Sequence, residues 1–478
     1  MKAMRRTKIV ATLGPASTDP AVLEEMIIAG VDVVRLNFSH GDVRSFIPLA
    51  KTIYVTANKV GRSIAILADL QGPKIRIARF QEDSVILTKG AAFILDASLE
   101  RNAGDVNQVG IDYPQLVTDV SSEDTLLLDD GRIVLTVEQI IGQAIHCTVK
   151  VGGVLSNNKG INRLGGGLSA EALSEKDRAD IEIAAQIGAD YVAVSFPRAA
   201  EDLIQARALL RAAGGEGGIV AKLERAEAIE AMDDIIRASD AVMVARGDLG
   251  VEIGDASLPP IQKKIIKRAR SLNRAVITAT QMMESMIDNA IPTRAEVFDV
   301  ANAVLDGTDA VMLSGETAIG NHPVAVIEAV DRVCLQAEQQ REIRVSDHRI
   351  DSEFARVDEA IAMAGMYLAN HMQVAAIGAL TSSGITVMWM SRISSGIPIF
   401  AITSNEKTSR KVALYRGVYP IKAPVIPADK ITVTQPLIEL LKQNGVIEDG
   451  DTVILTRGDI HAQGNTNTLK IVEVGAPC

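Results

Sequence analysis

The stretch AVMVARGDLGVEIG, residues 241–254, is the part of the sequence from which we infer the fold. Its first residues, Ala241–Ala245, form a short apolar run that is typical of a fully buried strand. The run gives way at once to Arg246 and Asp248, and the glycines around them let the backbone come close to a ligand. An acidic residue in this place can also serve merely to cap the next helix. Taken alone, the stretch leaves a ligand site and a plain helix cap as alternatives.

Seven other stretches repeat this pattern of a short apolar run that ends in polar residues. Amphipathic segments lie between the runs, and this alternation predicts a parallel sheet whose strands are joined by helices. Eight such strands match a closed (β/α)8 barrel; an open doubly wound sheet is the alternative, but no GxGxxG fingerprint opens a helix after an early strand. The predicted strands are Thr7–Leu13, Asp32–Phe38, Ser63–Leu70, Tyr191–Phe196, Gly218–Leu223, Ala241–Ala245, Ala275–Thr280 and Ala310–Leu313, and the predicted helices include Ala21–Ala29, Glu175–Ile187, Ala199–Ala212 and Ile261–Leu272.

The residues between the third run and the helix at Glu175 have a different texture. Short strand-like runs there are separated by Gly, Asp and Asn, which is typical of an inserted all-β module. The module leaves the barrel near Gly72 and returns near Gly165–Gly167, and glycine or proline at both junctions predicts a hinged lid. The predicted strands of the module are Ser84–Leu87, Phe93–Leu95, Thr125–Leu128, Ile133–Val137 and Ala144–Val149.

After Ser346 the alternation of helices and strands resumes and predicts a separate open α/β domain. The prolines Pro420, Pro424 and Pro427 predict a loop before its last helix. The predicted helices are Asp358–Asn370, Ile385–Arg392, Asn405–Leu414 and Thr432–Asn444, and the strands are Ala375–Leu380, Pro398–Thr403, Thr452–Thr456 and Lys470–Val474. We expect a barrel at residues 1–71 and 168–345, an inserted β-barrel lid at 72–167 and an effector-binding α/β domain at 346–478.

Composition and charge exclude several classes of protein. The 49 Lys and Arg against 60 Asp and Glu give a net charge of −11, which argues against nonspecific binding to nucleic acid or to anionic membranes. The only three cysteines, Cys147, Cys334 and Cys478, lack metal-type spacing and make a disulfide framework unlikely. This fits a reducing cytosol. The N-terminal apolar run is too short for a signal peptide, and a turn interrupts the uncharged run Met372–Ser391. The sequence therefore predicts a soluble, cytoplasmic protein.

The ends of the predicted strands carry an array of charged residues, and chemistry in a (β/α)8 barrel sits at these ends. Glu224 and Asp248 follow adjacent strands and could bind one divalent cation such as Mg²⁺ through oxygen ligands. Lys222 shares the face of Glu224, and Arg35 adds a second fixed cation. A divalent ion, an ammonium and a guanidinium together suit phosphoryl transfer, because the moving group spreads charge over its equatorial oxygens. Ion pairs that stabilise the barrel rim are the alternative for each residue alone.

The sequence resembles the pyruvate kinases over essentially its whole length. The family's barrel, lid and C-terminal domain match the three parts inferred above. The resemblance implies transfer of the phosphoryl group of phosphoenolpyruvate to ADP, giving pyruvate and ATP in the last step of glycolysis, by a homotetramer. The stretches that carry the resemblance are residues 6–15 (RTKIVATLGP), 35–41, 69–76, 222–224, 243–252, 279–286 (ATQMMESM), 292–296 and 312–317.

The resemblance assigns roles at the phosphoryl group and the metal. Glu224 and Asp248 would hold Mg²⁺ or Mn²⁺. Lys222 would stabilise the phosphoryl group during transfer, and Arg35 would bind its oxygens.

The resemblance also assigns the rest of the substrate site. Backbone N–H groups around Gly247 and Asp248, with Thr280, would receive the substrate carboxylate. Thr280 and Ser314 lie where the enolate is protonated, and the donor between them stays open. The nucleotide phosphates would meet Asn37, His40, Arg76 and Lys159, of which Lys159 reaches in from the lid.

The stretch from Asp69 to Arg76 departs from the commonest family pattern, because Lys74 stands where many members have Glu. In the potassium-requiring pattern, Asn, Ser, Asp and a backbone carbonyl bind K⁺. Here Asn37, Ser39, Asp69 and the carbonyl of Leu70 remain, but Lys74 brings its own ammonium. Because that ammonium can replace the charge of K⁺, we expect an enzyme that does not require K⁺. A Lys74 that points into solvent is the alternative.

A hydroxyl-rich loop lies between a strand and a helix of the C-terminal domain. Hydroxyls, a glycine and a helix N-terminus form a phosphate cradle, although a plain capped turn is the alternative. In the family this loop binds a phosphorylated allosteric effector, and the loop from Arg457 to Gly464 could close over it. The residues do not distinguish a sugar monophosphate, a sugar bisphosphate or a nucleotide. The loop residues are Thr381, Ser382, Ser383, Gly384 and Thr386.

Two other functions compete with phosphoryl transfer. A metal-dependent aldolase or lyase on a related barrel would share the pair Glu224 and Asp248 and an enolate intermediate, but would not need the lid or Lys159. A catalytically silent, effector-binding regulatory protein is the third class. The intact set of Arg35, Lys222, Glu224, Asp248 and Thr280 argues against that third class.

Overall fold

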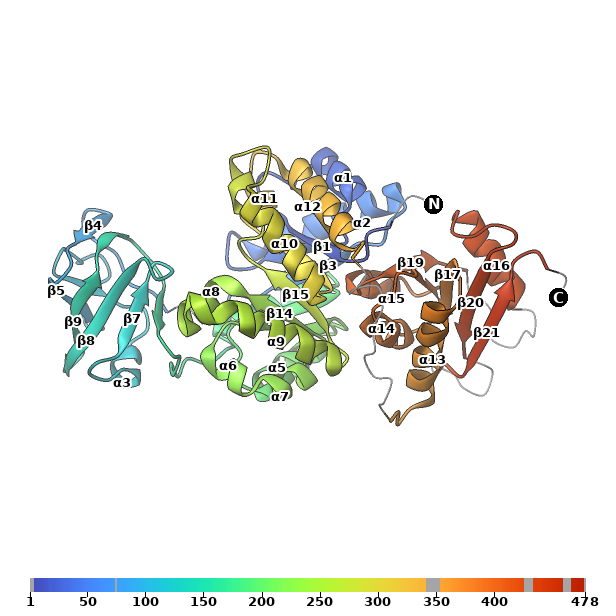
Figure 1. The fold of residues 1–478 in the computed structure, drawn as a ribbon. Helices are drawn as coiled ribbons and strands as arrows, with labels where there is room; N and C mark the ends of the chain where they lie inside the picture. Colours follow the sequence, from blue (N-terminus) through green and yellow to red (C-terminus); the bar gives the residue numbers. More distant parts are fainter. Residues whose placement is uncertain (1–3, 74, 341–352, 425–432, 459–465, 477–478) are drawn as a thin grey trace.

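The computed structural model describes residues 4–73, 75–340, 353–424, 433–458 and 466–476, which form three parts (Figure 1). A closed parallel barrel lies in the middle, an all-β module lies on one side of it, and an α/β sheet lies on the other. None of the described helices is long and apolar enough to span a bilayer.

The barrel contains all eight predicted strands, and their ends differ from the prediction by at most two residues. Every neighbouring pair is parallel and the sheet closes on itself, so the barrel prediction is confirmed and the open sheet is wrong. In the order around the barrel, the strands are β1 (Lys8–Thr12), β16 (Ala310–Leu313), β15 (Ala275–Ala279), β14 (Ala241–Ala245), β13 (Gly218–Leu223), β12 (Tyr191–Val194), β3 (Ala65–Asp69) and β2 (Val33–Asn37).

The barrel strands are buried on both faces, which is why they read as continuous apolar runs. In β14, Ala241 and Met243 belong to the core inside the barrel, whereas Val242 and Val244 pack in the layer between the strands and the helices. This period of two sets the direction of each polar side chain at a strand end.

Helices surround the barrel, and several begin at a clear cap. Asp19 caps the first helix by accepting a hydrogen bond from Ala21 N (2.8 Å), and Ser174 and Thr293 form capping boxes. The long helices are α1 (Pro20–Ala29), α2 (Phe46–Val60), α4 (Glu175–Gln186), α5 (Ala200–Ala212), α9 (Leu258–Ser271), α10 (Arg294–Asp306) and α12 (Pro323–Ala337); α6 (Ala226–Glu230), α7 (Met232–Ala238), α8 (Arg246–Ile253) and α11 (Gly315–Ala318) are short.

The inserted module has a hydrophobic core of its own, which includes Phe93, Leu126 and Leu135. Its strands form a six-stranded sheet and a two-stranded sheet, which differs from the single β-barrel expected, because strand patterns do not reveal how sheets close. The strands are β4 (Ser84–Leu87), β5 (Ala92–Asp96), β7 (Thr125–Leu128), β8 (Ile133–Ile141) and β9 (Ala144–Val151), with β6 (Gln108–Gly110), β10 (Gly153–Ser156) and β11 (Ile161–Arg163), which were not predicted; helix α3 (Leu116–Asp119) lies among them.

The C-terminal domain is a five-stranded sheet flanked by helices. The loop predicted around Pro420 is wrong, because residues there form strand β19; proline is tolerated since β19 lies at the sheet edge. Pro427 lies outside the described residues. The strands are β17 (Ala376–Leu380), β18 (Ile399–Thr403), β19 (Val418–Lys422), β20 (Thr452–Arg457) and β21 (Thr468–Glu473), and the helices are α13 (Val357–His371), α14 (Ile385–Arg392), α15 (Glu406–Lys411) and α16 (Thr434–Gln443).

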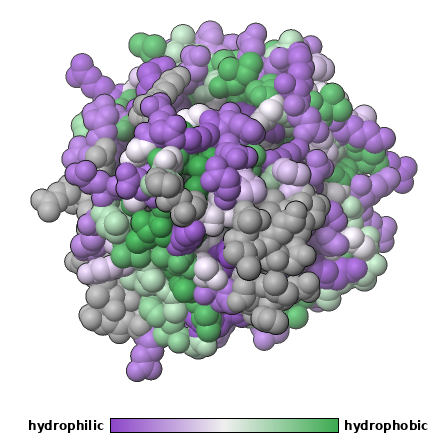
Figure 2. Space-filling view, turned by 90° about the vertical axis from the view of Figure 1, so that its right-hand side faces the viewer, coloured by the Kyte–Doolittle hydropathy of each residue, from purple (hydrophilic) through white to green (hydrophobic). Residues whose placement is uncertain are grey.

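The core inside the barrel continues into the C-terminal domain. Val10, Tyr191 and Met312 of the barrel belong to the same apolar cluster as Ile399 and Val418 of the C-terminal sheet. The C-terminal domain therefore covers the floor of the barrel. Its outward face carries hydrophilic side chains interspersed with apolar ones (Figure 2).

Candidate active site

Strand alternation turns four charged side chains into the mouth of the barrel. Val33 and Val220 lie in the inner core, so Arg35 and Lys222, two residues further along β2 and β13, face inward as well. Asp69 on β3 and Glu224 after β13 follow the same rule, and they are 1% and 0% exposed.

These four side chains form one network of ion pairs. The Lys222 ammonium lies 2.8 Å from Glu224 Oε1 and 3.5 Å from Asp69 Oδ1. It also donates a hydrogen bond to Ser195 Oγ at 2.7 Å. Arg35 Nε donates to Asp69 Oδ2 at 2.6 Å. Two fixed cations are therefore held side by side by carboxylates at the ends of β3 and β13, which flank β12 in the barrel.

The electrostatics of the mouth are set by burial and by these neighbours. Burial raises the pKa of Glu224 to about 7, although Lys222 opposes the rise. Burial alone would lower the pKa of Lys222, but Asp69 and Glu224 outweigh it and hold that pKa above its usual value. Burial also raises the pKa of Asp248. Lys222 thus stays an ammonium, while burial disfavours the negative forms of Glu224 and Asp248.

The mouth has oxygen atoms to offer a cation. Glu224 Oε1 and Asp69 Oδ1 are buried and receive no hydrogen bond, although Lys222 approaches both as an ion pair. Among the described residues no cluster of three or more His, Cys, Asp or Glu side chains could hold a metal. The pair Glu224 and Asp248 suits Mg²⁺, which takes one or two protein carboxylates and completes its shell with substrate oxygens and water.

The end of β15 has an unusual backbone. Thr280 and Gln281 adopt positive φ values of 66° and 54°, which are costly for residues other than glycine. Arg246 holds this turn, because its guanidinium donates to the carbonyl of Thr280 (2.6 Å) and pairs with Asp299 (2.7 Å). Sequence patterns placed Arg246 at a strand end but gave no sign that it fixes the neighbouring strand end. Gly247 N, expected to receive the substrate carboxylate, donates to Thr280 Oγ1 at 2.9 Å.

Ser314 follows β16 at the same end of the barrel. Its backbone N donates to Glu316 Oε2 at 2.7 Å, and Met283 N donates to Glu316 Oε1 at 3.1 Å. Glu316 therefore joins the ends of β15 and β16, which keeps the loops of Thr280 and Ser314 together.

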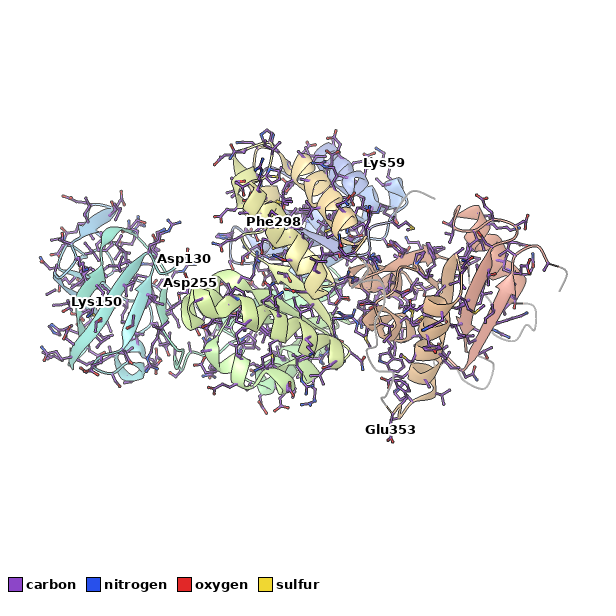
Figure 3. All side chains as sticks on the ribbon, in the orientation of Figure 1. Lys59, Asp130, Lys150, Asp255, Phe298 and Glu353 are labelled. Atoms are coloured by element: carbon purple, nitrogen blue, oxygen red, sulfur yellow. The ribbon has the colours of Figure 1, made fainter. Side chains whose placement is uncertain are left out.

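A cleft separates the barrel mouth from the inserted module. Ser39, Arg76, Phe196 and Asp248 line it, together with Asp130 of the module. Figure 3 shows Asp130 on the side of the module that faces the barrel.

The expected nucleotide residues are only partly brought together. Arg76 lines the cleft, whereas His40 is exposed at the rim and neither His40 nor Asn37 lines the cleft. Lys159 does not line it either, and its ammonium pairs with Asp129 of the same module at 2.7 Å.

Some residues of the expected monovalent-cation region lie next to one another. Ser39 N donates to Asn37 Oδ1 at 3.1 Å, and Ser195 Oγ donates to the carbonyl of Leu70 at 2.8 Å. Asp69 lies beside them in the network described above. Lys74, expected to replace K⁺, lies outside the described residues.

The hydroxyl-rich loop of the C-terminal domain precedes α14. Thr381 Oγ1 accepts from Gly384 N at 2.9 Å, and Thr386 pairs with Thr466 (2.6 Å), so these two hydroxyls serve the loop itself. Ser382 and Ser383 are exposed and line a cleft between the C-terminal domain and the barrel, as do Lys407 and Lys411. A larger residue in place of Gly384 would press against the side chain of Val412, because its Cβ would lie only 2.6 Å away.

Comparisons with known proteins agree with this geometry. Residues 4–327 match the barrel domain of pyruvate kinase, and residues 359–472 match its α/β domain. The chain is 57% identical to pyruvate kinase II of Salmonella typhimurium over 98% of this chain and 99% of that protein.

Two further relatives are similar along the chain. Pyruvate kinase of Haemophilus influenzae is 55% identical over 97% of both chains. Pyruvate kinase of Geobacillus stearothermophilus is 40% identical over 98% of this chain and 80% of that protein. These matches do not support the aldolase or lyase. The chain therefore belongs to the pyruvate kinase family.

Proposed function

We propose that this enzyme transfers the phosphoryl group of phosphoenolpyruvate to ADP, producing pyruvate and ATP in glycolysis. The observation that carries the proposal is the buried network of Arg35, Lys222, Asp69 and Glu224 at the barrel mouth. Its two cations can stabilise the charge that spreads over the oxygens of a phosphoryl group in transfer. The 57% identity to a pyruvate kinase along nearly the whole chain supports the same reaction.

Members of the family use Mg²⁺ or Mn²⁺, and in this chain Glu224 and Asp248 would hold the ion. The bound ion would supply positive charge to the substrate oxygens. The burial of Glu224, whose Oε1 is approached by the ammonium of Lys222 but receives no hydrogen bond, supports this assignment. Lys222 would stabilise the phosphoryl group between donor and acceptor, and Arg35 would bind its oxygens.

The substrate carboxylate would lie at the start of α8. The N–H groups of Gly247 and Asp248 stand at the N-terminus of this helix, where an anion is favoured. Thr280 Oγ1, which accepts from Gly247 N, would share that carboxylate. Thr280 and Ser314 remain the two candidates beside the enolate when it takes its proton.

The nucleotide would bind against Arg76 in the cleft and extend to Asn37 and His40, which lie outside the cleft lining. Lys159 would join it from the inserted module once it leaves Asp129, so we propose that residues 72–167 act as a hinged lid. The barrel would then comprise residues 1–71 and 168–345, and the effector domain residues 346–478.

We further propose that the enzyme works without K⁺. Asn37, Ser39, Asp69 and the carbonyl of Leu70 would form the monovalent-cation region, and Lys74 would supply the charge. Asp69 Oδ1, which receives no hydrogen bond and has the ammonium of Lys222 at 3.5 Å, is a suitable acceptor for such a cation.

A phosphorylated metabolite would regulate the enzyme at the loop of Thr381, Ser382, Ser383, Gly384 and Thr386. The exposed hydroxyls of Ser382 and Ser383 and the nearby ammonium of Lys411 support an anionic ligand. We also propose a homotetramer in the cytoplasm. The buried free thiols of Cys147 and Cys334 suit a reducing compartment.

The deciding experiment measures pyruvate and ATP formed from phosphoenolpyruvate, ADP and Mg²⁺. We expect equal amounts of both products, and no reaction once a chelator removes the metal. A preparation that is folded but forms no pyruvate would contradict the proposal. Adding sugar monophosphates, sugar bisphosphates and nucleotides in turn at low phosphoenolpyruvate would identify the effector as the compound that raises the rate.

A further inference from the structure

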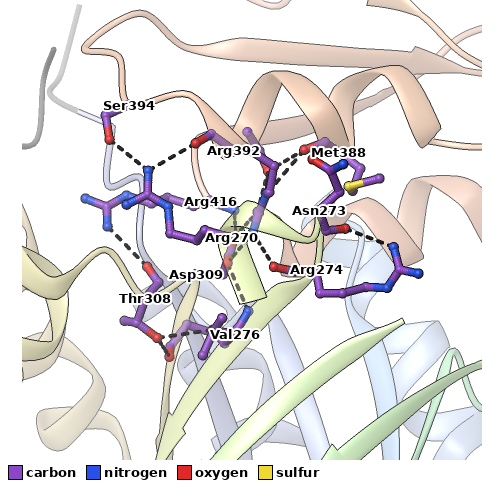
Figure 4. A network of polar contacts seen from close by, with 12 residues as sticks. Arg270, Asn273, Arg274, Val276, Thr308, Asp309, Met388, Arg392, Ser394 and Arg416 are labelled. Carbon is purple, nitrogen blue, oxygen red and sulfur yellow. Dashed lines mark hydrogen bonds and ion pairs between the residues drawn. The ribbon is translucent and has the colours of Figure 1, made fainter. Parts of the chain in front are cut away.

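A second cluster of charged side chains lies at the opposite end of the barrel, where the C-terminal domain covers the floor. Figure 4 shows Arg270, Arg392 and Arg416 converging around Asp309. Beside them lies a small cavity, with about 20 Å³ of space open to the centre of a water-sized molecule. Its polar lining comes from Arg6 and Arg270 of the barrel and from Arg416, Ser391, Ser394 and Ser395 of the C-terminal part.

The two carboxylates of this cluster are already engaged. Asp309 forms a buried ion pair with Arg392, in which Arg392 Nη1 lies 2.8 Å from Asp309 Oδ2, and both residues are 1% exposed. Glu338 accepts hydrogen bonds from the backbone of Arg6 (2.8 Å) and Thr7 (2.6 Å), and it lies 3.6 Å from the guanidinium of Arg6. Each carboxylate therefore has one arginine of its own.

Arg270 and Arg416 have no carboxylate on their guanidinium groups among the described residues. Arg270 donates to the carbonyl of Arg392 and to Ser394 Oγ, both at 3.0 Å. Arg416 Nη1 donates to the carbonyls of Val304 (3.0 Å) and Thr308 (3.2 Å). Arg416 Nη2 is buried and has no hydrogen-bond partner.

Among the described residues, the arginines around the cavity thus outnumber the carboxylates by two. Arginine does not lose its proton in proteins, so these charges persist at neutral pH. Burial, together with Arg416 and Arg392, lowers the pKa of Arg270 to about 10. Apolar side chains such as Met366 and Ile393 form the rest of the wall, where water screens charge poorly.

The serine hydroxyls add donors of their own. Ser394 Oγ accepts from Arg270, and Ser395 Oγ accepts from Ile397 N at 3.1 Å. Neither hydroxyl has an acceptor within the described part of the chain. Both can therefore turn their hydrogen toward a ligand in the cavity.

We propose that this cavity binds one small inorganic anion, chloride or phosphate, which bridges Arg270 of the barrel and Arg416 of the C-terminal domain. The anion would supply the negative charge that Asp309 and Glu338 do not. Because its ligands come from both domains, binding would tighten their contact. The site is separate from the barrel mouth and does not depend on the proposed reaction.

The test uses the full-length enzyme, dialysed into gluconate buffer. Chloride, phosphate and additional gluconate are each titrated at constant ionic strength while the thermal midpoint Tm is followed. We expect Tm to rise and saturate with chloride or with phosphate, and to stay constant with the larger gluconate. Crystals soaked in bromide should show an anomalous peak between Arg270 and Arg416.

Arg270→Gln and Arg416→Gln should each raise the half-saturating anion concentration at least about tenfold, since each removes one charged ligand. Arg274→Gln is the matched control: the guanidinium of Arg274 also donates to backbone carbonyls, those of Ser239 and Arg237 in the barrel, but Arg274 does not line the cavity. If either glutamine variant fails to fold, Arg270→Lys, which keeps the charge, should retain saturable binding.

Three results would overturn the proposal. One is a Tm that responds equally to all three anions. Another is an equal loss of the response in Arg274→Gln. The third is a bromide-soaked crystal with no anomalous peak, or with a carboxylate of the chain itself between the two arginines.

Discussion

The two ends of the barrel bury charge in opposite excess. At the mouth, Arg35 and Lys222 face the carboxylates of Asp69, Glu224 and Asp248, and two carboxylate oxygens are approached by Lys222 but receive no hydrogen bond. At the floor, counting only the described residues, four arginines face the two carboxylates of Asp309 and Glu338, and one buried guanidinium nitrogen, Arg416 Nη2, has no hydrogen-bond acceptor.

This comparison shows how a buried imbalance indicates the sign of a missing ligand. Burying a charge without a partner costs several kcal/mol, so an excess persists when something of opposite sign offsets it. We therefore expect the mouth to bind a cation and the floor to bind an anion. The ion pairs at the floor should also be structural, whereas those at the mouth should serve the reaction.

The largest effect is expected at the floor. Arg392→Leu removes the side-chain partner of the buried Asp309 and leaves it only the backbone N–H groups of Val276 and Arg416 as hydrogen-bond donors, which should lower the free energy of unfolding by about 3–5 kcal/mol. Chemical denaturation measures this loss. The double variant Arg392→Leu/Asp309→Leu should recover part of it. Arg237→Leu, which breaks an exposed pair with Asp234, is the control and should cost less than about 1 kcal/mol. A single variant as stable as the control would mean that the pair is not structural.

The mouth should respond in catalysis instead. Lys222→Met should lower kcat for pyruvate formation by about 10²–10³-fold, the usual loss when one group that stabilises transition-state charge is removed. Lys59→Met, at an exposed helix position (Figure 3), is the matched control and should leave kcat unchanged. If Lys222→Met kept kcat within tenfold of the wild type but lowered the stability, the ion pairs at the mouth would be structural, like those at the floor.

The negative excess at the mouth should also appear in the pH dependence of stability. Burial raises the pKa of Glu252, which lines the cleft, to about 7. Because the unfolded chain releases this proton at a lower pH than the folded protein, Glu252 costs no stability below about pH 4.5. Between about pH 4.5 and 7 it lowers the free energy of unfolding by at most about 1.4 kcal/mol per pH unit, and above pH 7 the loss levels off.

Unfolding free energies of wild type and Glu252→Gln between pH 4.5 and 8 measure this dependence. Glutamine does not ionise, so the variant should gain on the wild type as pH rises and then keep a constant difference. A difference that shrinks with rising pH would show that the Glu252 carboxylate is stabilised by neighbouring cations.

The smallest effect concerns K⁺. If Lys74 supplies the monovalent charge at the mouth, replacing K⁺ by a bulky organic cation should change kcat by less than about twofold. Lys74→Glu, the residue common in the family, should make the activity depend on K⁺. Activity only in the presence of K⁺ would leave the proposed reaction standing and would contradict the role of Lys74 as a substitute for K⁺.

The sequence was sufficient for the barrel and for the direction of its charged side chains. Each barrel strand is apolar on both faces, and a period of two then sends Arg35, Lys222 and Glu224 inward. It was not sufficient for β19, because Pro420 is a turn signal that an edge strand tolerates.

Contacts between distant residues were also beyond the sequence. The buried pair of Arg392 and Asp309 joins two domains, and nothing local marks either residue. The clamp of Arg246 on the carbonyl of Thr280 is equally invisible, because a backbone carbonyl has no sequence signature.

The apolar core shared by the barrel floor and the C-terminal sheet affects how the chain can be synthesised. The last barrel strand ends at Leu313, whereas β18 begins at Ile399. At 5–20 residues per second, the ribosome needs roughly 4–17 s to deliver the residues between them. During that interval Tyr191 and Met312 lack their packing partners from the C-terminal sheet, and the floor of the nascent barrel exposes apolar side chains to solvent. We therefore expect the growing chain to need a chaperone's protection most during those seconds.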